Sequence, residues 1–301
     1  MSTGGPGSLP ALGVVLMLWS DDVAAATGPL LAGVRNMGYT LIELPLFGSG
    51  AANLKEAGRR VADAGLRCTV NTALPPGLSL LQPERWMEAV TFLGNIAAQA
   101  HALGADLVCG PLLAPVGDLP DASPGARERE SALAGLTAVA RRAADVGVTL
   151  ALEPLNRFES AYPTTVAEAC LLVDAVGAAN LGLLLDTFHM NIEERDSAAA
   201  IRLAGSRLRH FHCSENDRGP VGSGHIAWPT VRGALQDTDY RGDLVVESFG
   251  STVPAISRAC CIWRPLAADA TALAQESVSF LRLLWGADAG VESNREREKS
   301  T

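Results

Sequence analysis

Residues 183–194 read LLLDTFHMNIEE, a run of leucines followed at once by a polar and acidic stretch. A short, wholly apolar run of this kind is typical of a strand buried on both faces, as in a parallel sheet. Asp186 stands where the apolar run stops, and His189 follows three residues later. We therefore expect a buried strand whose carboxyl end leads into a loop of polar, functional side chains.

The same pattern recurs along the chain, where short apolar runs, most of them preceded by glycine, alternate with alanine-rich amphipathic stretches. Apolar spacings of three and four residues predict helices over 57–64, 86–103 and 128–146. Strands that alternate with helices predict a parallel sheet with right-handed crossovers. The candidate strands cover 13–18, 38–44, 65–70, 104–110, 147–153, 181–186, 208–212 and 243–248.

This alternation in 301 residues predicts a single-domain α/β protein, a (β/α)8 TIM barrel over residues 11–287, with flexible tails at 1–10 and 288–301. A doubly wound open sheet is the competing fold. Its usual phosphate-binding signature is missing, because GSGAAN at 48–53 lacks the third glycine. We expect those glycines to be ordinary loop residues.

Composition and charge exclude several classes of partner. The net charge of -9 and the absence of a basic run with interleaved aromatics disfavour nucleic acid. The apolar start at 11–19 is too short to span a bilayer, so we expect no membrane association. The six cysteines show no CxxC spacing and mostly lie in apolar runs, which predicts buried, reduced thiols and a cytoplasmic protein.

Potential metal ligands end the last four predicted strands. In a (β/α)8 barrel the chemistry gathers at the carboxyl ends of the strands. One such acid alone is more simply a helix cap or an arginine partner, but four ligands in consecutive order favour a shared site. Three buried carboxylates repel one another unless a cation compensates, and a mixed O/N donor set suits Mn²⁺, Co²⁺ or Mg²⁺, with Mn²⁺ the first choice. The predicted ligands are Glu153, Asp186, His212 and Glu247.

Glu153 and Glu247 end strands that are three positions apart around the ring, so their side chains should approach the cation from nearly opposite sides. Two carboxylates that act on opposite faces of a planar enediolate would invert a carbon, which favours epimerisation over aldose–ketose isomerisation. His189 and Arg218 are the candidates for stabilising the oxyanion. We expect His210 to be a hydrogen-bonded core histidine and His101 to be structural.

Several segments together resemble the ketose 3-epimerases, in order and over most of the chain. The resemblance implies an isomerase of carbohydrate metabolism that interconverts C3 epimers of free ketohexoses or ketopentoses, of the D-allulose/D-fructose, D-tagatose/D-sorbose or L-ribulose/L-xylulose type. It also implies a homodimer or homotetramer. The matching segments are LALEPLNRFES (150–160), LLLDTFHMNIEE (183–194), HFHCSENDRGPVGSGHIAW (210–228), VVESF (245–249) and CIWRPL (261–266).

The resemblance implies the same metal ligands and assigns Glu153 and Glu247 as the catalytic, proton-transferring pair. It further implies that Glu159, His189 and Arg218 hold the oxygens of the substrate, and Trp19 is expected near the same pocket. The chain departs from the family pattern at Pro154, which should make its strand leave the sheet early, and at residues 72–73 beside the pocket.

Other functions of related barrels are alternatives to the epimerase. A hydroxypyruvate isomerase-like or inosose dehydratase-like enzyme could use the same glutamates, and a metal-free sugar-binding barrel is a third possibility. A DNA-repair endonuclease of similar fold is disfavoured, because the chain has only five histidines and a net charge of -9.

Overall fold

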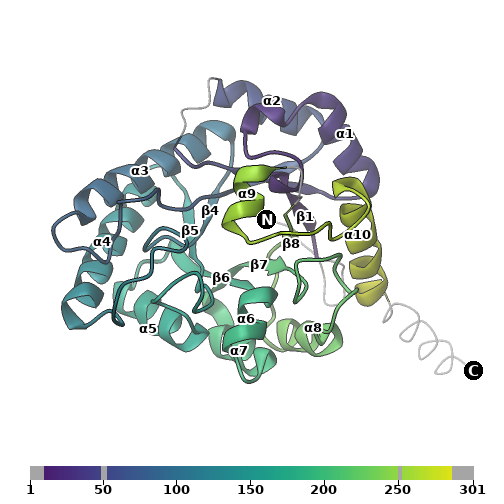
Figure 1. Cartoon of the computed structure of the whole chain (residues 1–301). Helices are drawn as coiled ribbons and strands as arrows, with labels where there is room; N and C mark the ends of the chain where they lie inside the picture. The colour runs from purple at the N-terminus through teal and green to yellow at the C-terminus, as the bar shows by residue number, and fades with distance from the viewer. Residues whose placement is uncertain (1–9, 49–52, 250–252, 287–301) are drawn as a thin grey trace, which may run out of the picture.

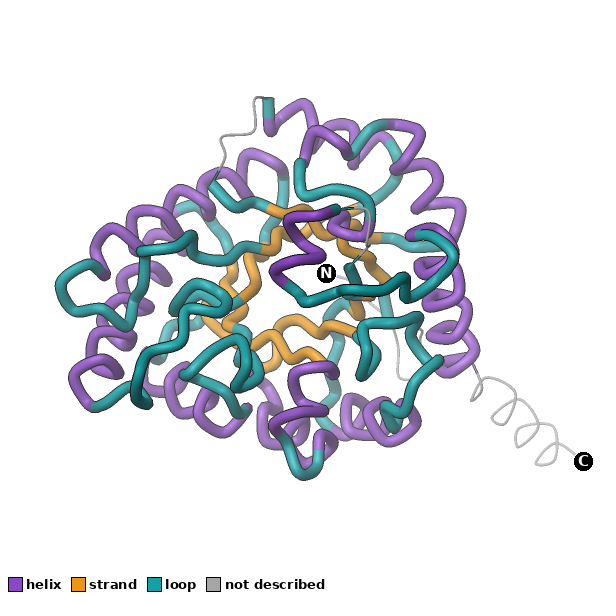
Figure 2. Tube along the Cα trace, viewed as in Figure 1, coloured by secondary structure: helices purple, strands orange, loops and turns teal. Residues whose placement is uncertain are grey.

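A computed structural model describes residues 10–48, 53–249 and 253–286. In this structure parallel strands close into a barrel in sequence order, with β1 hydrogen-bonded to β8 (Figures 1 and 2). The (β/α)8 prediction is confirmed. The strands are β1 Leu12–Val15, β2 Leu41–Pro45, β3 Arg67–Asn71, β4 Leu107–Gly110, β5 Thr149–Leu152, β6 Leu181–Asp186, β7 Leu208–Cys213 and β8 Leu244–Val246.

Helices surround the barrel, and the three predicted from apolar spacing correspond to α2, α3 and α4. Three short 3-10 turns, η1 Leu16–Leu18, η2 Val23–Ala25 and η3 Gly205–Arg207, lie between the longer elements. The helices are α1 Gly28–Met37, α2 Leu54–Asp63, α3 Trp86–Leu103, α4 Ala126–Asp145, α5 Val166–Val176, α6 Thr187–Glu193, α7 Ser197–Ala204, α8 Trp228–Asp237, α9 Pro254–Ala259 and α10 Ala270–Gly286.

Strand alternation decides which side chains fill the barrel. On β7, Phe211 belongs to the main hydrophobic core and its ring lies 6.4 Å from that of Tyr240. His210 and His212 have the opposite orientation and face the barrel interior, as a period of two requires. A separate small apolar cluster of Cys109, Ala151 and Leu184 also lies in the barrel.

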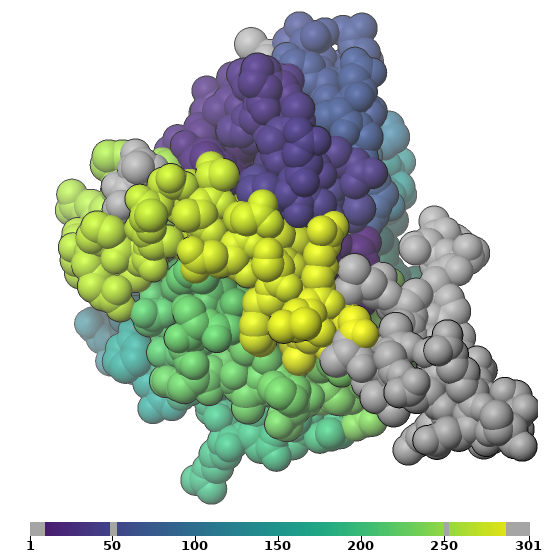
Figure 3. Space-filling view, turned by 90° about the vertical axis from the view of Figure 1, so that its right-hand side faces the viewer, coloured from purple at the N-terminus to yellow at the C-terminus, as the bar shows by residue number. Residues whose placement is uncertain are grey.

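The last helix completes the outer ring. Figure 3 shows α10, in yellow, on the surface between the N-terminal helices and α8. The hydroxyl of Tyr39 donates to the carbonyl of Ala274 at 2.7 Å, and Nη2 of Arg282 donates to the carbonyl of Gly38 at 2.9 Å. Gly38 ends α1 with φ +103°, a left-handed conformation that favours glycine.

Three further expectations from the sequence concern the chain ends and the GSGAAN segment, the cysteines, and membrane-spanning helices. The predicted tails at 1–10 and 288–301, except residue 10, and most of the GSGAAN segment lie outside the described residues. Four cysteines are buried as expected, but Cys260 is half-buried and Cys261 is exposed, because they follow α9 on the surface. Among the described helices, none has both the length and the apolar character needed to cross a membrane.

Candidate active site

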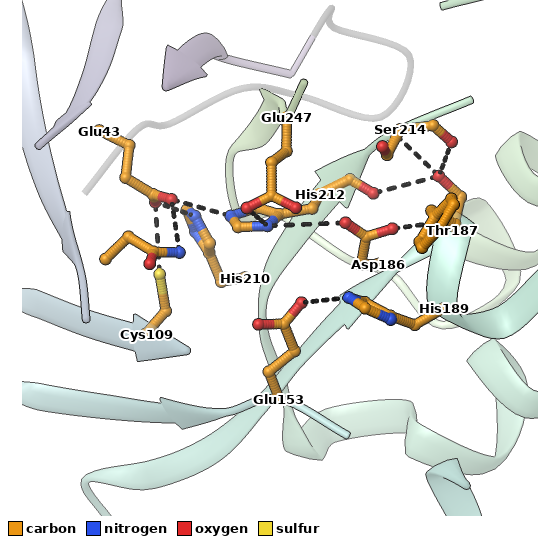
Figure 4. A network of polar contacts seen from close by, with 12 residues as sticks. Glu43, Cys109, Glu153, Asp186, Thr187, His189, His210, His212, Ser214 and Glu247 are labelled. Carbon is orange, nitrogen blue, oxygen red and sulfur yellow. Dashed lines mark hydrogen bonds and ion pairs between the residues drawn. The ribbon is translucent and has the colours of Figure 1, made fainter. Parts of the chain in front are cut away.

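The four predicted ligands, which we call the quartet, converge at the carboxyl ends of β5 to β8. Glu153, Asp186, His212 and Glu247 each offer one atom, and these four atoms lie within 4.8 Å of one another. All four side chains are buried. Figure 4 shows Glu153 and Glu247 reaching toward the same space from opposite sides, as the strand positions predict.

Pro154 does not draw Glu153 out of this arrangement. Strand β5 ends at Leu152, yet the backbone N–H of Glu153 still donates to the carbonyl of Gly110 on β4 at 3.0 Å. Hydrogen bonding to the neighbouring strand therefore continues to the residue before the proline. Pro154 does not displace Glu153 from the sheet.

The free atoms of the quartet are those that a cation would use. Nδ1 of His212 lies 3.2 Å from Oε1 of Glu247 and 3.9 Å from Oδ2 of Asp186. Within the described part of the chain, neither this nitrogen nor Oε1 of Glu153 has a hydrogen-bond partner. Buried polar atoms are rarely left unpaired, so this donor set fits a divalent cation.

Arg218 supplies the positive charge of the site. Its Nη1 donates to Oδ2 of Asp186 at 2.9 Å, to Oε2 of Glu247 at 2.8 Å and to Oγ of Ser214 at 2.8 Å. The guanidinium also lies over the ring of Phe188, 3.9 Å from its centroid, and is buried. Arg218 is therefore buried against Asp186 and Glu247 and is not an exposed loop arginine.

The loop that carries Arg218 is organised by a buried carboxylate that the sequence reading did not single out. Glu215 accepts hydrogen bonds from the indole of Trp228 at 2.6 Å and from the backbone of Gly222 at 2.9 Å. Arg218 itself has φ +63°, a conformation unusual for a side chain of this size. The loop bonds therefore hold a strained residue in place.

His189 enters the site from α6 as a neutral group. The backbone N–H of Asn156 donates to its Nδ1 at 3.1 Å, so its Nε2 carries the hydrogen. Nε2 lies 3.7 Å from Oε1 of Glu153. Burial lowers the pKa of His189 to about 3, partly opposed by Asp186.

A cavity opens above the quartet, and of the two residues expected there only Glu159 is part of its lining. Glu159 lines the cavity and accepts from Nδ2 of Asn156 at 2.8 Å, and burial raises its pKa. Trp19 is not among the residues that line the cavity, and its indole N–H instead points to Oγ1 of Thr271, 3.5 Å away. The η1 turn presents Met17 to the cavity in its place.

This cavity has a volume of about 310 Å³. Ala73 lines it, whereas the hydroxyl of Thr72 donates to the carbonyl of Leu46 at 2.6 Å. The α9 helix lies across the open face of the barrel in Figure 1 and contributes to the wall. The polar inner end includes Glu153, Glu159, His189, Arg218 and Glu247, and the outer wall includes Phe47, Leu74, Pro115, Phe249 and Ile256.

The two glutamates differ in proton affinity. Burial raises the pKa of Glu153 well above its usual value, and the neighbouring Glu247 adds to the rise. Burial opposes ionisation of Glu247 as well, but His212 and Arg218 outweigh it and lower its pKa to about 2. In the metal-free protein, one carboxyl group of the pair is thus biased to keep its proton and the other to lose it.

His210 is a hydrogen-bonded core histidine, as predicted. Its Nε2 lies 2.7 Å from Oε2 of Glu43, and Nε2 of His212 lies 2.9 Å from Oε1 of the same carboxylate. Burial would raise the pKa of Glu43, but the two histidines lower it well below the usual value. His101, expected to be structural, is exposed on α3.

The chain is similar to a known protein family and to known proteins over most of its length. Residues 31–284 match the xylose isomerase-like TIM barrel family. The L-ribulose 3-epimerase of Mesorhizobium japonicum is 34% identical over 90% of this chain and 93% of its own. The D-psicose 3-epimerase of Agrobacterium fabrum is 29% identical over 91% of this chain and 99% of its own.

Solved structures agree with the sequence relatives. The D-allulose 3-epimerase of a Methylomonas species, in complex with D-allulose, superposes with a TM-score of 0.85 at 30% identity, over 91% of this chain and 96% of the other. An L-ribulose 3-epimerase structure gives a TM-score of 0.86 at 32% identity, over 96% and 97% of the two chains.

The chain belongs to the xylose isomerase-like TIM barrel family and, within it, to the ketose 3-epimerases. It is therefore an enzyme of the isomerase class.

Proposed function

We propose that the protein is a divalent-metal-dependent ketose 3-epimerase that acts on free ketohexoses or ketopentoses. The observation that carries this proposal is the convergence of Glu153 and Glu247, with Asp186 and His212, at the inner end of the cavity. The names of the relatives, 3-epimerases of L-ribulose and of D-psicose, support a free ketose as the substrate.

The residues that would hold the cation are Glu153, Asp186, His212 and Glu247. Their oxygen and nitrogen donors suit Mn²⁺ first, with Co²⁺ and Mg²⁺ as alternatives. When bound, such a cation would polarise the C2 carbonyl of a ketose and stabilise negative charge on its oxygen.

The two glutamates would move the proton. The carboxylate of one takes the hydrogen from C3 as a proton, the electrons of the C–H bond form a C2–C3 double bond, and the C2 oxygen becomes negative. The other glutamate, as a carboxylic acid, gives a proton to C3 from the opposite face and inverts this carbon. The reverse reaction exchanges their roles.

Neighbouring donors would hold the substrate in place. The hydrogen on Nε2 of His189 and the guanidinium of Arg218 both face the inner end of the cavity, with 3.3 Å between Nε2 and Nη2. Two donors this close suit one shared oxygen acceptor, such as the developing oxyanion. Glu159, on the same wall, would accept a hydrogen bond from a sugar hydroxyl.

Hydrogen exchange at C3 tests the proposal. Protein loaded with Mn²⁺ is incubated in deuterium oxide with L-ribulose, D-allulose, D-fructose or D-tagatose. We expect deuterium at C3 together with the C3 epimer, both detected by NMR. Formation of an aldose or loss of water would instead indicate an isomerase or a dehydratase, and binding without any exchange would indicate a sugar-binding barrel.

A further inference from the structure

A second polar cluster lies beside the first and shares His212 with it. We call it the Glu43 cluster, and Figure 4 shows Glu43, Cys109, His210 and His212 together. None of its members except His212 has a role in the proposed reaction. The cluster consists of Glu43 on β2, Thr69 and Asn71 on β3, Cys109 on β4, and His210 and His212 on β7, all buried.

Glu43 accepts hydrogen bonds from every other member of this cluster. Its Oε2 lies 2.8 Å from Oγ1 of Thr69, 2.7 Å from Nε2 of His210 and 3.4 Å from Sγ of Cys109. Its Oε1 lies 2.9 Å from Nε2 of His212 and 3.4 Å from Nδ2 of Asn71. An ionised carboxylate can only accept, so both histidines must carry a hydrogen on Nε2.

The Glu43 cluster is itself a group of possible metal ligands, since Glu43, Cys109, His210 and His212 also offer atoms within 4.8 Å of one another. The bonds already made argue against a cation there, because both oxygens of Glu43 are engaged by these donors. Burial also raises the pKa of the Cys109 thiol, which keeps the ligating thiolate form scarce. The cluster is a closed hydrogen-bond network.

This network determines which nitrogen of His212 faces the quartet. With a hydrogen on Nε2, the lone pair of the neutral imidazole is on Nδ1. Nδ1 is the atom 3.2 Å from Oε1 of Glu247, and it has no hydrogen-bond partner among the described residues. The other tautomer would place a hydrogen on Nδ1, where Glu247 could accept it, and the ligand position would be blocked.

We propose that Glu43 is a positioning residue for the cation site, because it holds the hydrogen on Nε2 of His212 and thereby presents the Nδ1 lone pair to the cation. Glu43 reaches His212 across the barrel from β2 to β7. The inference rests on the proposed metal dependence and extends it to a residue outside the quartet.

Mn²⁺ affinity measured by titration calorimetry tests the proposal. Glu43→Met has a similar length but no acceptor, so the bound state would bury the Nε2 hydrogen of His212 unpaired, and we expect the Kd for Mn²⁺ to rise 10- to 100-fold. Glu43→Gln keeps one carbonyl acceptor and should lose less. Thr69→Val removes another hydrogen bond of Glu43 and should stay within about threefold of wild type.

The possible titration results are distinguishable. Wild-type affinity in a folded Glu43→Met variant, or an equal loss of affinity in Thr69→Val, would overturn the role of Glu43 but leave the proposed cation site standing. Failure of the wild-type protein to bind Mn²⁺ would overturn the proposed cation site and this inference with it.

NMR of the imidazole nitrogens gives a readout that a purely structural role would not change, and it needs no variant. In ¹⁵N-histidine-labelled wild-type protein, we expect the Nε2 hydrogen of His212 to exchange slowly with solvent, both without metal and with diamagnetic Mg²⁺. The Nδ1 signal should shift far more than the Nε2 signal when Mg²⁺ binds, because Nδ1 gives up any hydrogen and becomes the ligand. A spectrum in which His212 carries its hydrogen on Nδ1 and not on Nε2 would overturn the proposal, even if Glu43→Met does not fold.

Discussion

Nη1 of Arg218 lies 2.8 Å from Oε2 of Glu247, and both side chains are buried. The same nitrogen bonds Asp186. A single guanidinium therefore balances part of the negative charge that Asp186 and Glu247 bring together, and it lies beside a carboxylate that we propose to transfer the proton. Arginine suits this position because its planar group bonds carboxylates and stacks on aromatic rings at once.

Replacing Arg218 should reduce turnover strongly. For Arg218→Lys we expect kcat to fall by about 10²- to 10³-fold, because the ammonium group cannot both bond the carboxylates and donate to the oxyanion. Epimerisation assayed at saturating Mn²⁺ measures the effect. The control is Arg264→Lys, which changes an exposed ion pair with Asp217 and should leave kcat unchanged. An Arg218→Lys enzyme with near wild-type kcat would contradict this role.

Metal binding should stabilise the fold. At free Mn²⁺ a hundredfold above Kd, we expect about 2.7 kcal/mol of added stability, seen as a higher melting temperature that EDTA reverses. Asp186→Asn, which weakens one of the four proposed ligands, should show a much smaller shift. Identical melting curves for wild-type protein with Mn²⁺ and with EDTA would count against a resident cation.

Metal binding should also release protons. Burial and Glu247 raise the pKa of Glu153, while Glu247 and Glu43 raise the pKa of His212 against the opposing effect of burial. Raised values mean that both groups hold protons to higher pH in the metal-free protein, and ligation requires those protons to leave. The apparent affinity for Mn²⁺ should therefore rise with pH. Calorimetry in buffers of different ionisation enthalpy counts the protons, and a count of zero near pH 7 would disprove this linkage.

The stability of the main hydrophobic core should depend on its large buried side chains. Phe211 is fully buried between the barrel and Tyr240, so Phe211→Ala should lower the free energy of unfolding by about 3–5 kcal/mol. Leu283→Ala, on the exposed face of α10, should change it by less than about 0.5 kcal/mol. Urea denaturation measures the free energy of unfolding of both variants. A loss for Phe211→Ala as small as that for Leu283→Ala would mean that the side chain of Phe211 is not tightly packed.

Sequence reasoning could predict the barrel and the quartet because both follow from local patterns. An apolar run that ends in Asp186 marks a strand end by itself, and the closed topology then brings neighbouring strand ends together. Glu153 and Glu247 could be paired in the same way, with no knowledge of packing. The ring order of the strands is enough to place them on opposite sides.

The remaining features depend on contacts between distant segments. Glu43 and His212 are 169 positions apart, and only the register of the closed barrel makes them partners. A single glutamate within the apolar strand LIELP was the available signal for a buried polar contact. Trp19 was expected near the pocket, but the η1 turn, whose geometry the sequence does not reveal, presents Met17 instead.

Hydrogen exchange measured separately on each epimer of a ketose pair shows whether Glu153 and Glu247 act on opposite faces of one carbon. In deuterium oxide with saturating Mn²⁺, each of Glu153→Gln and Glu247→Gln keeps only one proton-accepting glutamate. We predict that each variant loses epimerisation, by at least about 10²-fold, and that Glu153→Gln still exchanges the C3 hydrogen of one epimer while Glu247→Gln exchanges that of the other. Exchange of the same epimer by both Mn²⁺-loaded variants, or retained epimerisation in either, would contradict the account.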